Sequence, residues 1–185
     1  QAAAPGRHPV EVAMLLMTVA MVMVPGIDAI ANTLSATLAA AQIAWGRFLF
    51  QLVFLAPLML GRPVAIPRSD WPAHAARGVL IAAATICFFT ALAVMPLADA
   101  IAIFFIEPLL LSLLAGWFLG EGIGWRRLVA IAVGFAGAML VVQPSFQAFG
   151  AYALLPLAAA GFFAVYLLLT RRLGAHCDAV TMQVT

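Results

Sequence analysis

Three ionisable side chains interrupt long apolar stretches of this sequence. Asp28, Arg47 and Glu107 each lie within runs rich in Ala, Leu, Ile, Val and Phe. An ionisable group inside a membrane-spanning helix costs about 2.5–3.5 kcal/mol on insertion scales, so it usually has a partner or marks the path of a substrate or proton. A carboxyl group can bind a proton, and a guanidinium can bind an anionic group through two parallel hydrogen bonds. The pattern favours binding of a small polar solute over covalent catalysis.

The composition indicates the environment of these side chains. Apolar residues make up 66% of the 185 positions, charged residues make up 9%, and the mean hydropathy is +1.13. Soluble domains are about 45–50% apolar and about 25% charged. A soluble core cannot bury so much apolar surface in so short a chain. The sequence therefore predicts a protein whose main partner is a lipid bilayer.

Six apolar runs are long enough, or nearly so, to cross a bilayer, which takes about 20 helical residues. Gly and Pro residues lie between the runs, and no run alternates polar and apolar residues with the period of two that a strand requires. We therefore expect an all-α fold, a polytopic bundle of six transmembrane helices. The expected spans are residues 10–31, 41–60, 77–94, 97–119, 128–142 and 151–170.

The arginines outside these spans fall on alternate loops. The loops after the first, third and fifth expected spans contain no basic residue. Basic residues accumulate on the cytoplasmic loops of membrane proteins. The pattern predicts a multi-pass protein of the bacterial inner membrane with a cytoplasmic N-terminus. The arginines of the loops and helix ends are Arg7, Arg62, Arg68, Arg77, Arg126, Arg127, Arg171 and Arg172.

Asp28 and Arg47 are expected at similar depths in the outer half of the bilayer. A rise of 1.5 Å per residue places them about 5 Å and about 9 Å from the outer ends of their spans. One interpretation is an ion pair that fixes the first span against the second. The other is a site in which Arg47 anchors an anionic group of a substrate, with Gln51 one turn further along the same face.

Glu107 is expected about 13 Å from the outer end of the fourth span, close to the midplane. No second cation is expected at that depth, and burial favours the neutral acid, so Glu107 is a candidate site for a proton or a cation. The alternative is a structural carboxyl group that is hydrogen-bonded through Thr85 or Thr90 of a neighbouring helix. Pro108 is expected to kink the span, which either exposes polar backbone near the site or only serves packing.

The residue types do not support cofactor binding, nucleic-acid binding, metal binding or catalysis. The chain has no Lys, which a Schiff-base cofactor requires, and its net charge of +2 is too small to indicate a nucleic-acid partner. Cys87 and Cys177 show no metal-ligand spacing. No G-x-S-x-G or H-E-x-x-H motif is present, so an intramembrane enzyme is the weakest hypothesis. We expect no catalytic residue, no cofactor and no metal.

A set of ordered motifs carries a family resemblance. PLADA at residues 96–100 opens the fourth expected span, and LGE at 119–121 closes it. WRR at 125–127 and GFAG at 134–137 follow, and W-x-R-F occupies 45–48. Together, over essentially the whole chain, these motifs resemble the EamA-type branch of the drug/metabolite transporter superfamily.

The resemblance implies ten helices in two inverted five-helix repeats around a central substrate pathway. Residues 1–9 would then be a cytoplasmic segment, residues 10–143 the first repeat and residues 150–185 the start of a second repeat. Basic residues follow the sixth span but not the first, which agrees with an inverted second copy. Because the chain ends after the sixth span, we expect either that the second half lies outside this sequence or that two copies form a homodimer.

The sequence thus predicts a secondary transporter, or permease, that moves a small-molecule metabolite by alternating access, with proton coupling as one hypothesis. The alternative is a non-transporting membrane scaffold or partner subunit. The candidate residues of the substrate pathway are Asp28, Arg47, Gln51, Glu107 and Pro108.

Overall fold

The computed structural model describes residues 7–59, 70–119, 124–142 and 149–174. These residues form helices and short turns, and no strand occurs among them, so the predicted all-α fold is confirmed. The helices are α1 (Arg7–Leu34), α2 (Ala40–Met59), α3 (Trp71–Leu92), α4 (Leu97–Phe104), α5 (Glu107–Leu119), α6 (Trp125–Val142), the 3-10 turn η2 (Gly150–Ala153) and α8 (Leu154–Leu173).

Over the described residues, each of the six expected spans is mostly helical. Within the described ranges, three helical stretches are both long and apolar enough to cross a membrane. α6 contains a shorter apolar stretch, Leu128–Gly137. The three long stretches are Trp71–Leu92, Leu97–Phe118 and Gly150–Leu173.

The third helix begins six residues earlier than the sequence analysis placed it, at Trp71 instead of residue 77. Pro72 lies in its first turn, where the missing N–H of proline costs nothing because that donor has no partner within the helix. The expected start was wrong because a hydropathy window stops at an arginine. Arg77 consequently lies inside α3, and its side chain is only 2% exposed.

The fourth expected span is divided into two helices. α4 ends at Phe104 and α5 begins at Glu107, with a turn at Phe105 and Ile106 between them. Ile106 N–H donates to the carbonyl of Ile103 at 3.3 Å, so the backbone tightens at the break. Pro108 lies in the first turn of α5. The interruption expected near this proline is therefore present.

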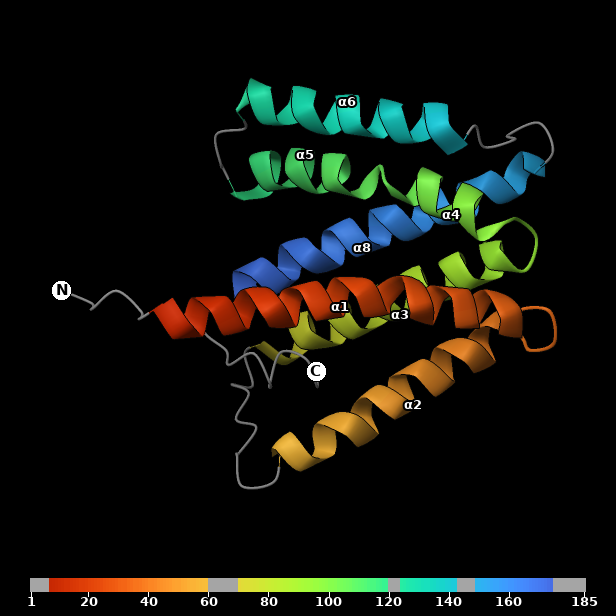
Figure 1. Ribbon diagram of the computed structural model, residues 1–185, viewed down its shortest axis with the longest axis horizontal. Helices are drawn as coiled ribbons and strands as arrows, with labels where there is room; N and C mark the ends of the chain where they lie inside the picture. Colours follow the sequence, from red (N-terminus) through yellow and green to blue (C-terminus); the bar gives the residue numbers. More distant parts are fainter. Residues whose placement is uncertain (1–6, 60–69, 120–123, 143–148, 175–185) are drawn as a thin grey trace.

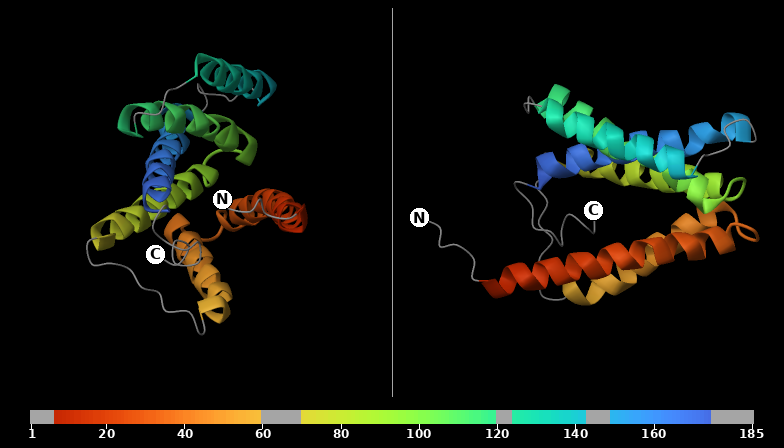
Figure 2. Two further views of the ribbon diagram at one scale, coloured as in Figure 1. Left: turned by 90° about the vertical axis from the view of Figure 1, so that its left-hand side faces the viewer. Right: turned by 45° about the horizontal axis from the view of Figure 1, so that its top comes forward.

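The helices lie side by side along the long axis of the molecule, and α8 occupies the middle (Figure 1). α3 packs against one side of α8, and α4 and α5 pack against another. α6 lies outside α4 and α5, whereas α1 and α2 lie on the side of α3 (Figure 2). The last helix of the sequence is therefore central to the packing.

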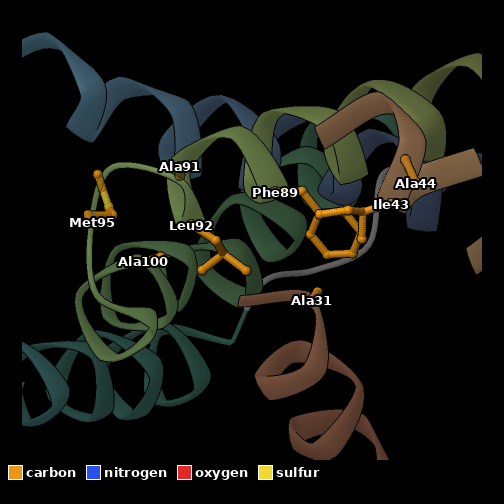
Figure 3. Close-up of a cluster of buried hydrophobic side chains, with 8 residues drawn as sticks. All are labelled: Ala31, Ile43, Ala44, Phe89, Ala91, Leu92, Met95 and Ala100. Carbon is orange, nitrogen blue, oxygen red and sulfur yellow. The ribbon is translucent and has the colours of Figure 1, made fainter. Parts of the chain in front are cut away.

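A cluster of buried apolar side chains holds α1 and α2 against α3 and α4 (Figure 3). Phe89 of α3 is only 1% exposed and lies beside Ile43 of α2. Nearby, the Ser35 hydroxyl donates to the Asn32 carbonyl at 2.6 Å and shares this bond with the Leu92 carbonyl at 3.2 Å, which brings the end of α1 against α3. The cluster consists of Ala31, Ile43, Ala44, Phe89, Ala91, Leu92, Met95 and Ala100.

A second cluster joins α5 to α8. Leu111 and Ala115 of α5 pack against Ala164 and Leu168 of α8, and all four are buried. Small residues such as these alanines let two helix backbones approach closely in a membrane, where packing rather than the hydrophobic effect drives association.

One end of the bundle carries most of the described arginines. α1, α3 and α6 begin at this end and α8 ends there, on the left of Figure 1. Arg126, Arg171 and Arg172 are exposed there, and Arg172 donates to the Phe118 carbonyl at 2.6 Å. We call this end the arginine-rich end.

Candidate functional site

A cavity of about 310 Å³ lies between α1, α2, α3, α4 and α8. Small-molecule sites usually measure about 300–1,000 Å³ and combine an apolar lining with a few polar groups. This cavity has that character, since one carboxylate, one guanidinium and one hydroxyl accompany seven apolar side chains. Its lining consists of Asp28, Arg47, Ile81, Ala84, Thr85, Phe88, Ile101, Phe104, Phe105 and Phe163.

Asp28 and Arg47 enter this cavity from two different helices. α1 continues to Leu34, so Asp28 lies about 9 Å from its end, while Arg47 lies about 10 Å from the start of α2. The two are thus more nearly level than the sequence suggested. No hydrogen bond or ion pair joins them in the part of the chain that the structure describes. The cavity therefore presents two opposite charges that attract each other without a direct hydrogen bond.

Arg47 is held in place by an aromatic ring. Its guanidinium carbon lies 5.9 Å from the ring centroid of Phe89, within the range of a cation–π contact. Phe89 belongs to the buried cluster of Figure 3, so the contact anchors the cation to a rigid part of the bundle.

Phenylalanine rings form much of the cavity wall. Phe88 and Phe104 meet edge to face with centroids 5.4 Å apart, and Phe104 lies 5.7 Å from Phe163. Such contacts are favourable for aromatic pairs and fix the orientation of each ring. The wall thus joins α3, α4 and α8.

One face of α3 supplies four lining residues. Ile81, Ala84, Thr85 and Phe88 follow the spacing i, i+3, i+4, i+7, which places them on the same side of a helix. The Thr85 hydroxyl donates to the Ile81 carbonyl at 2.8 Å, so its only proton is directed at the helix backbone. None of these four residues is charged, so charge does not mark them in the sequence, although their helical spacing is present there.

Phe163 is a further lining residue that was not predicted from the sequence. Its helix was expected to begin a second repeat, and no charged residue drew attention to that segment. Its role in the wall depends on α8 packing between α3 and α4, which periodicity alone cannot reveal.

Glu107 and Pro108 do not line the cavity. Glu107 lies directly after the break between α4 and α5, and its Oε1 is buried with no hydrogen-bond partner among the described residues. The threonines considered as partners bond elsewhere. Thr90 donates to the Ile86 carbonyl at 2.7 Å, and Thr85 donates within α3 as described above. An unsatisfied buried oxygen is costly, which makes this atom unusual in the bundle.

Gln51 lies one turn beyond Arg47 in α2 and is not among the residues that line the cavity. Over the ranges that the structure covers, no three His, Cys, Asp or Glu side chains gather as a metal ion would require. The candidate site therefore consists of Asp28 and Arg47 within an aromatic wall. Glu107 lies outside the cavity, although it is close in sequence to the lining residues Phe104 and Phe105.

Comparison with known proteins adds a family match. Residues 11–143 match the EamA-like transporter family. The chain is 34% identical over 154 residues to the pseudopaline exporter CntI of Pseudomonas aeruginosa, an alignment that covers 80% of this chain and 53% of the exporter. It is 33% identical over 142 residues to a riboflavin transporter of Rhizobium johnstonii, covering 76% of this chain and 47% of that protein.

A third relative is the S-adenosylmethionine uptake transporter of Rickettsia bellii, which is 29% identical over 123 residues. That alignment covers 66% of this chain and 42% of the transporter. The chain thus spans about half the length of the curated relatives it matches. No solved structure matches it.

Proposed function

Because the chain belongs to the EamA-like transporter family, we propose that it moves a small metabolite across the bacterial inner membrane as a secondary transporter. The apolar helices and the named transporters among its relatives make it a multi-pass membrane protein. Those relatives are transporters and not enzymes, which supports the non-enzymatic role expected from the sequence.

The observation that carries this proposal is the cavity between five helices. It holds Asp28 and Arg47 within a wall of phenylalanines. Charged groups inside a membrane bundle are expensive, and they usually line a site or a water-filled path. In our proposal, the cavity binds the substrate, Arg47 and Asp28 contact its polar groups, and the rings contact its apolar part.

Alternating access requires the two ends of the bundle to open in turn around this cavity. We propose that the arginine-rich end faces the cytoplasm, as the distribution of basic residues favours. The cavity is expected to open toward the other side of the membrane in the described conformation. Inverted repeats and a site near the midplane are common in secondary transporters, which supports this arrangement.

We further propose Glu107 as the site of a coupling proton. Its buried Oε1 has no hydrogen-bond partner in the described part of the chain. A bound proton would remove the charge of a carboxylate that is poorly solvated there. Glu107 also lies at the break between α4 and α5, directly after the cavity residues Phe104 and Phe105. In our proposal, a change in the charge of Glu107 therefore shifts these two rings.

The test uses the full polypeptide in proteoliposomes. Riboflavin and S-adenosylmethionine, the compounds named for two relatives, are suitable first probes, followed by a wider metabolite panel. We expect flux of a substrate above that of empty vesicles, and Arg47→Gln to reduce it at least about tenfold, the effect of about 1.4 kcal/mol. Arg126→Gln, which removes an exposed arginine outside the cavity, is the matched control.

Two results would contradict the proposal. If no compound of the panel moves faster than in empty vesicles, the scaffold hypothesis gains support. If Arg47→Gln and Arg126→Gln transport like the unmodified protein, the cavity is not the substrate site.

A further inference from the structure

Arg77 is a buried cation between α3 and α8. Its Nε donates to the Thr170 hydroxyl oxygen at 2.9 Å, and its guanidinium carbon lies 5.2 Å from the ring centroid of Tyr166. Its Nη1 also lies 3.4 Å from Nδ1 of His74, which is itself buried. Because arginine stays charged, burial to 2% exposure is tolerable only with partners of this kind.

Thr170 is oriented to receive this hydrogen bond. Its hydroxyl donates its single proton to the Tyr166 carbonyl at 2.7 Å, within α8. The oxygen lone pairs are therefore left to accept from Arg77. The bond consequently joins two helices instead of competing with the helix backbone.

This contact lies between the cavity and the arginine-rich end. Ile81, a cavity residue, is one turn beyond Arg77 in α3, about 6 Å along the axis. On α8, the ring of Phe163, another cavity residue, stacks on Tyr166 at 5.6 Å. The aromatic wall of the cavity thus continues through Tyr166 to Arg77.

We propose that Arg77, Thr170 and Tyr166 form a gate that closes the path between the cavity and the arginine-rich end. The inference rests on the proposed transport function. For this end to open, α3 and α8 must separate there, which breaks the Arg77–Thr170 hydrogen bond and lifts the guanidinium from Tyr166. The hydrogen bond to Thr170 and the cation–π contact with Tyr166 together favour closure, and each is weak enough to break in every transport cycle.

The test measures access to the cavity from each side of the membrane. The reporter is Ile81→Cys in full-length protein in which every native cysteine, Cys87 and Cys177 among them, is replaced by Ser. A membrane-impermeant thiol reagent is added to sealed vesicles from one side or the other. Gly124→Cys, at the exposed start of α6, identifies the arginine-rich side.

Thr170→Val removes the hydroxyl that accepts from Arg77 and keeps the shape of the side chain. Thr90→Val is the matched control, since Thr90 makes the same kind of bond to its own helix. Arg77→Lys is a second variant, which keeps the charge but loses the Nε donor and the planar group over Tyr166.

We expect Thr170→Val and Arg77→Lys to raise labelling of Ile81→Cys from the arginine-rich side about fivefold, the effect of losing one hydrogen bond. Labelling from the other side should fall or stay constant, and Thr90→Val should match the parent. Unchanged labelling in both gate variants overturns the proposal, and so does an equal rise from both sides, which indicates general loosening. Labelling needs no substrate, so it tests the gate separately from transport. The labelling result can contradict the gate while flux is observed, and it can support the gate while no flux is observed.

Discussion

Asp28 of α1 and Arg47 of α2 line the same cavity, yet no hydrogen bond or ion pair joins them in the described part of the chain. From the sequence, an ion pair between the two helices and a substrate site were equally open interpretations. We propose the second interpretation, because two charges that share no hydrogen bond in a membrane bundle are costly without a ligand or water to solvate them. Arg47 is instead positioned by the ring of Phe89.

The aromatic wall should contribute to substrate affinity. Phe105→Ala removes a ring that lines the cavity and is half exposed, so the fold should tolerate the change. We expect the KM for transport to rise about tenfold, since a lost aromatic contact of about 1.5 kcal/mol has that effect. The measurement is initial flux against substrate concentration.

Phe118→Ala is the matched control for this prediction. Phe118 is 53% exposed, close to the 50% of Phe105, but lies at the end of α5 outside the cavity lining. An equal rise in KM in both variants would mean that the Phe105 effect does not come from the cavity.

Glu107→Gln should uncouple transport from protons. The amide keeps the size of the side chain but binds no proton, so accumulation driven by a pH gradient should disappear while substrate exchange at equal concentrations continues. Asp99→Asn, which changes an acid in the first turn of α4, is expected to leave accumulation intact. Undiminished, gradient-dependent accumulation in Glu107→Gln would refute the proton-site proposal.

Phe89 should be important for stability as well as for positioning Arg47. Phe89 is only 1% exposed, so Phe89→Ala leaves a cavity in the core. We expect the free energy of unfolding to fall by about 3–5 kcal/mol, as for other buried phenylalanines. Phe54→Ala, which truncates a ring that is 77% exposed on α2, should cost much less. Unfolding in mixed micelles compares the two, and equal losses would contradict the packing of Figure 3.

The orientation in the membrane can be tested directly. Gly124→Cys lies at the start of α6 at the arginine-rich end, whereas Ala36→Cys lies in the turn between α1 and α2 at the opposite end. We expect an impermeant thiol reagent added outside intact cells to label position 36 and not position 124. The reverse labelling would show that the arginine-rich end faces outward.

The helices could be predicted from the sequence because apolar runs near bilayer length leave few alternatives. Membrane insertion requires every backbone donor and acceptor to be satisfied within the helix, so hydropathy alone locates most spans. The prediction failed at the start of α3, where Arg77 was predicted to be the first residue of a span beside a cytoplasmic loop. Its partners, Thr170 and Tyr166, lie 93 and 89 positions away in sequence, and no local pattern indicates such a contact.

The candidate site was only partly predictable for the same reason. Asp28 and Arg47 stand out because charge is rare in apolar segments, and both line the cavity. Phe163 does not stand out, since one more aromatic residue in an apolar helix carries no signal. Glu107 and Gln51 were also selected by residue type, but neither lines the cavity, because residue type does not determine which way a helix face turns.

The most direct test of the central claim is protection of the cavity by substrate. Ile81→Cys, in the protein without its native cysteines, is labelled by a thiol reagent at increasing concentrations of a transported compound. We predict that labelling slows severalfold, with half-protection near the KM for transport, while labelling of Gly124→Cys outside the cavity stays constant. Transport without any protection at position 81 would contradict the account, because the substrate would then pass through the protein without occupying this cavity.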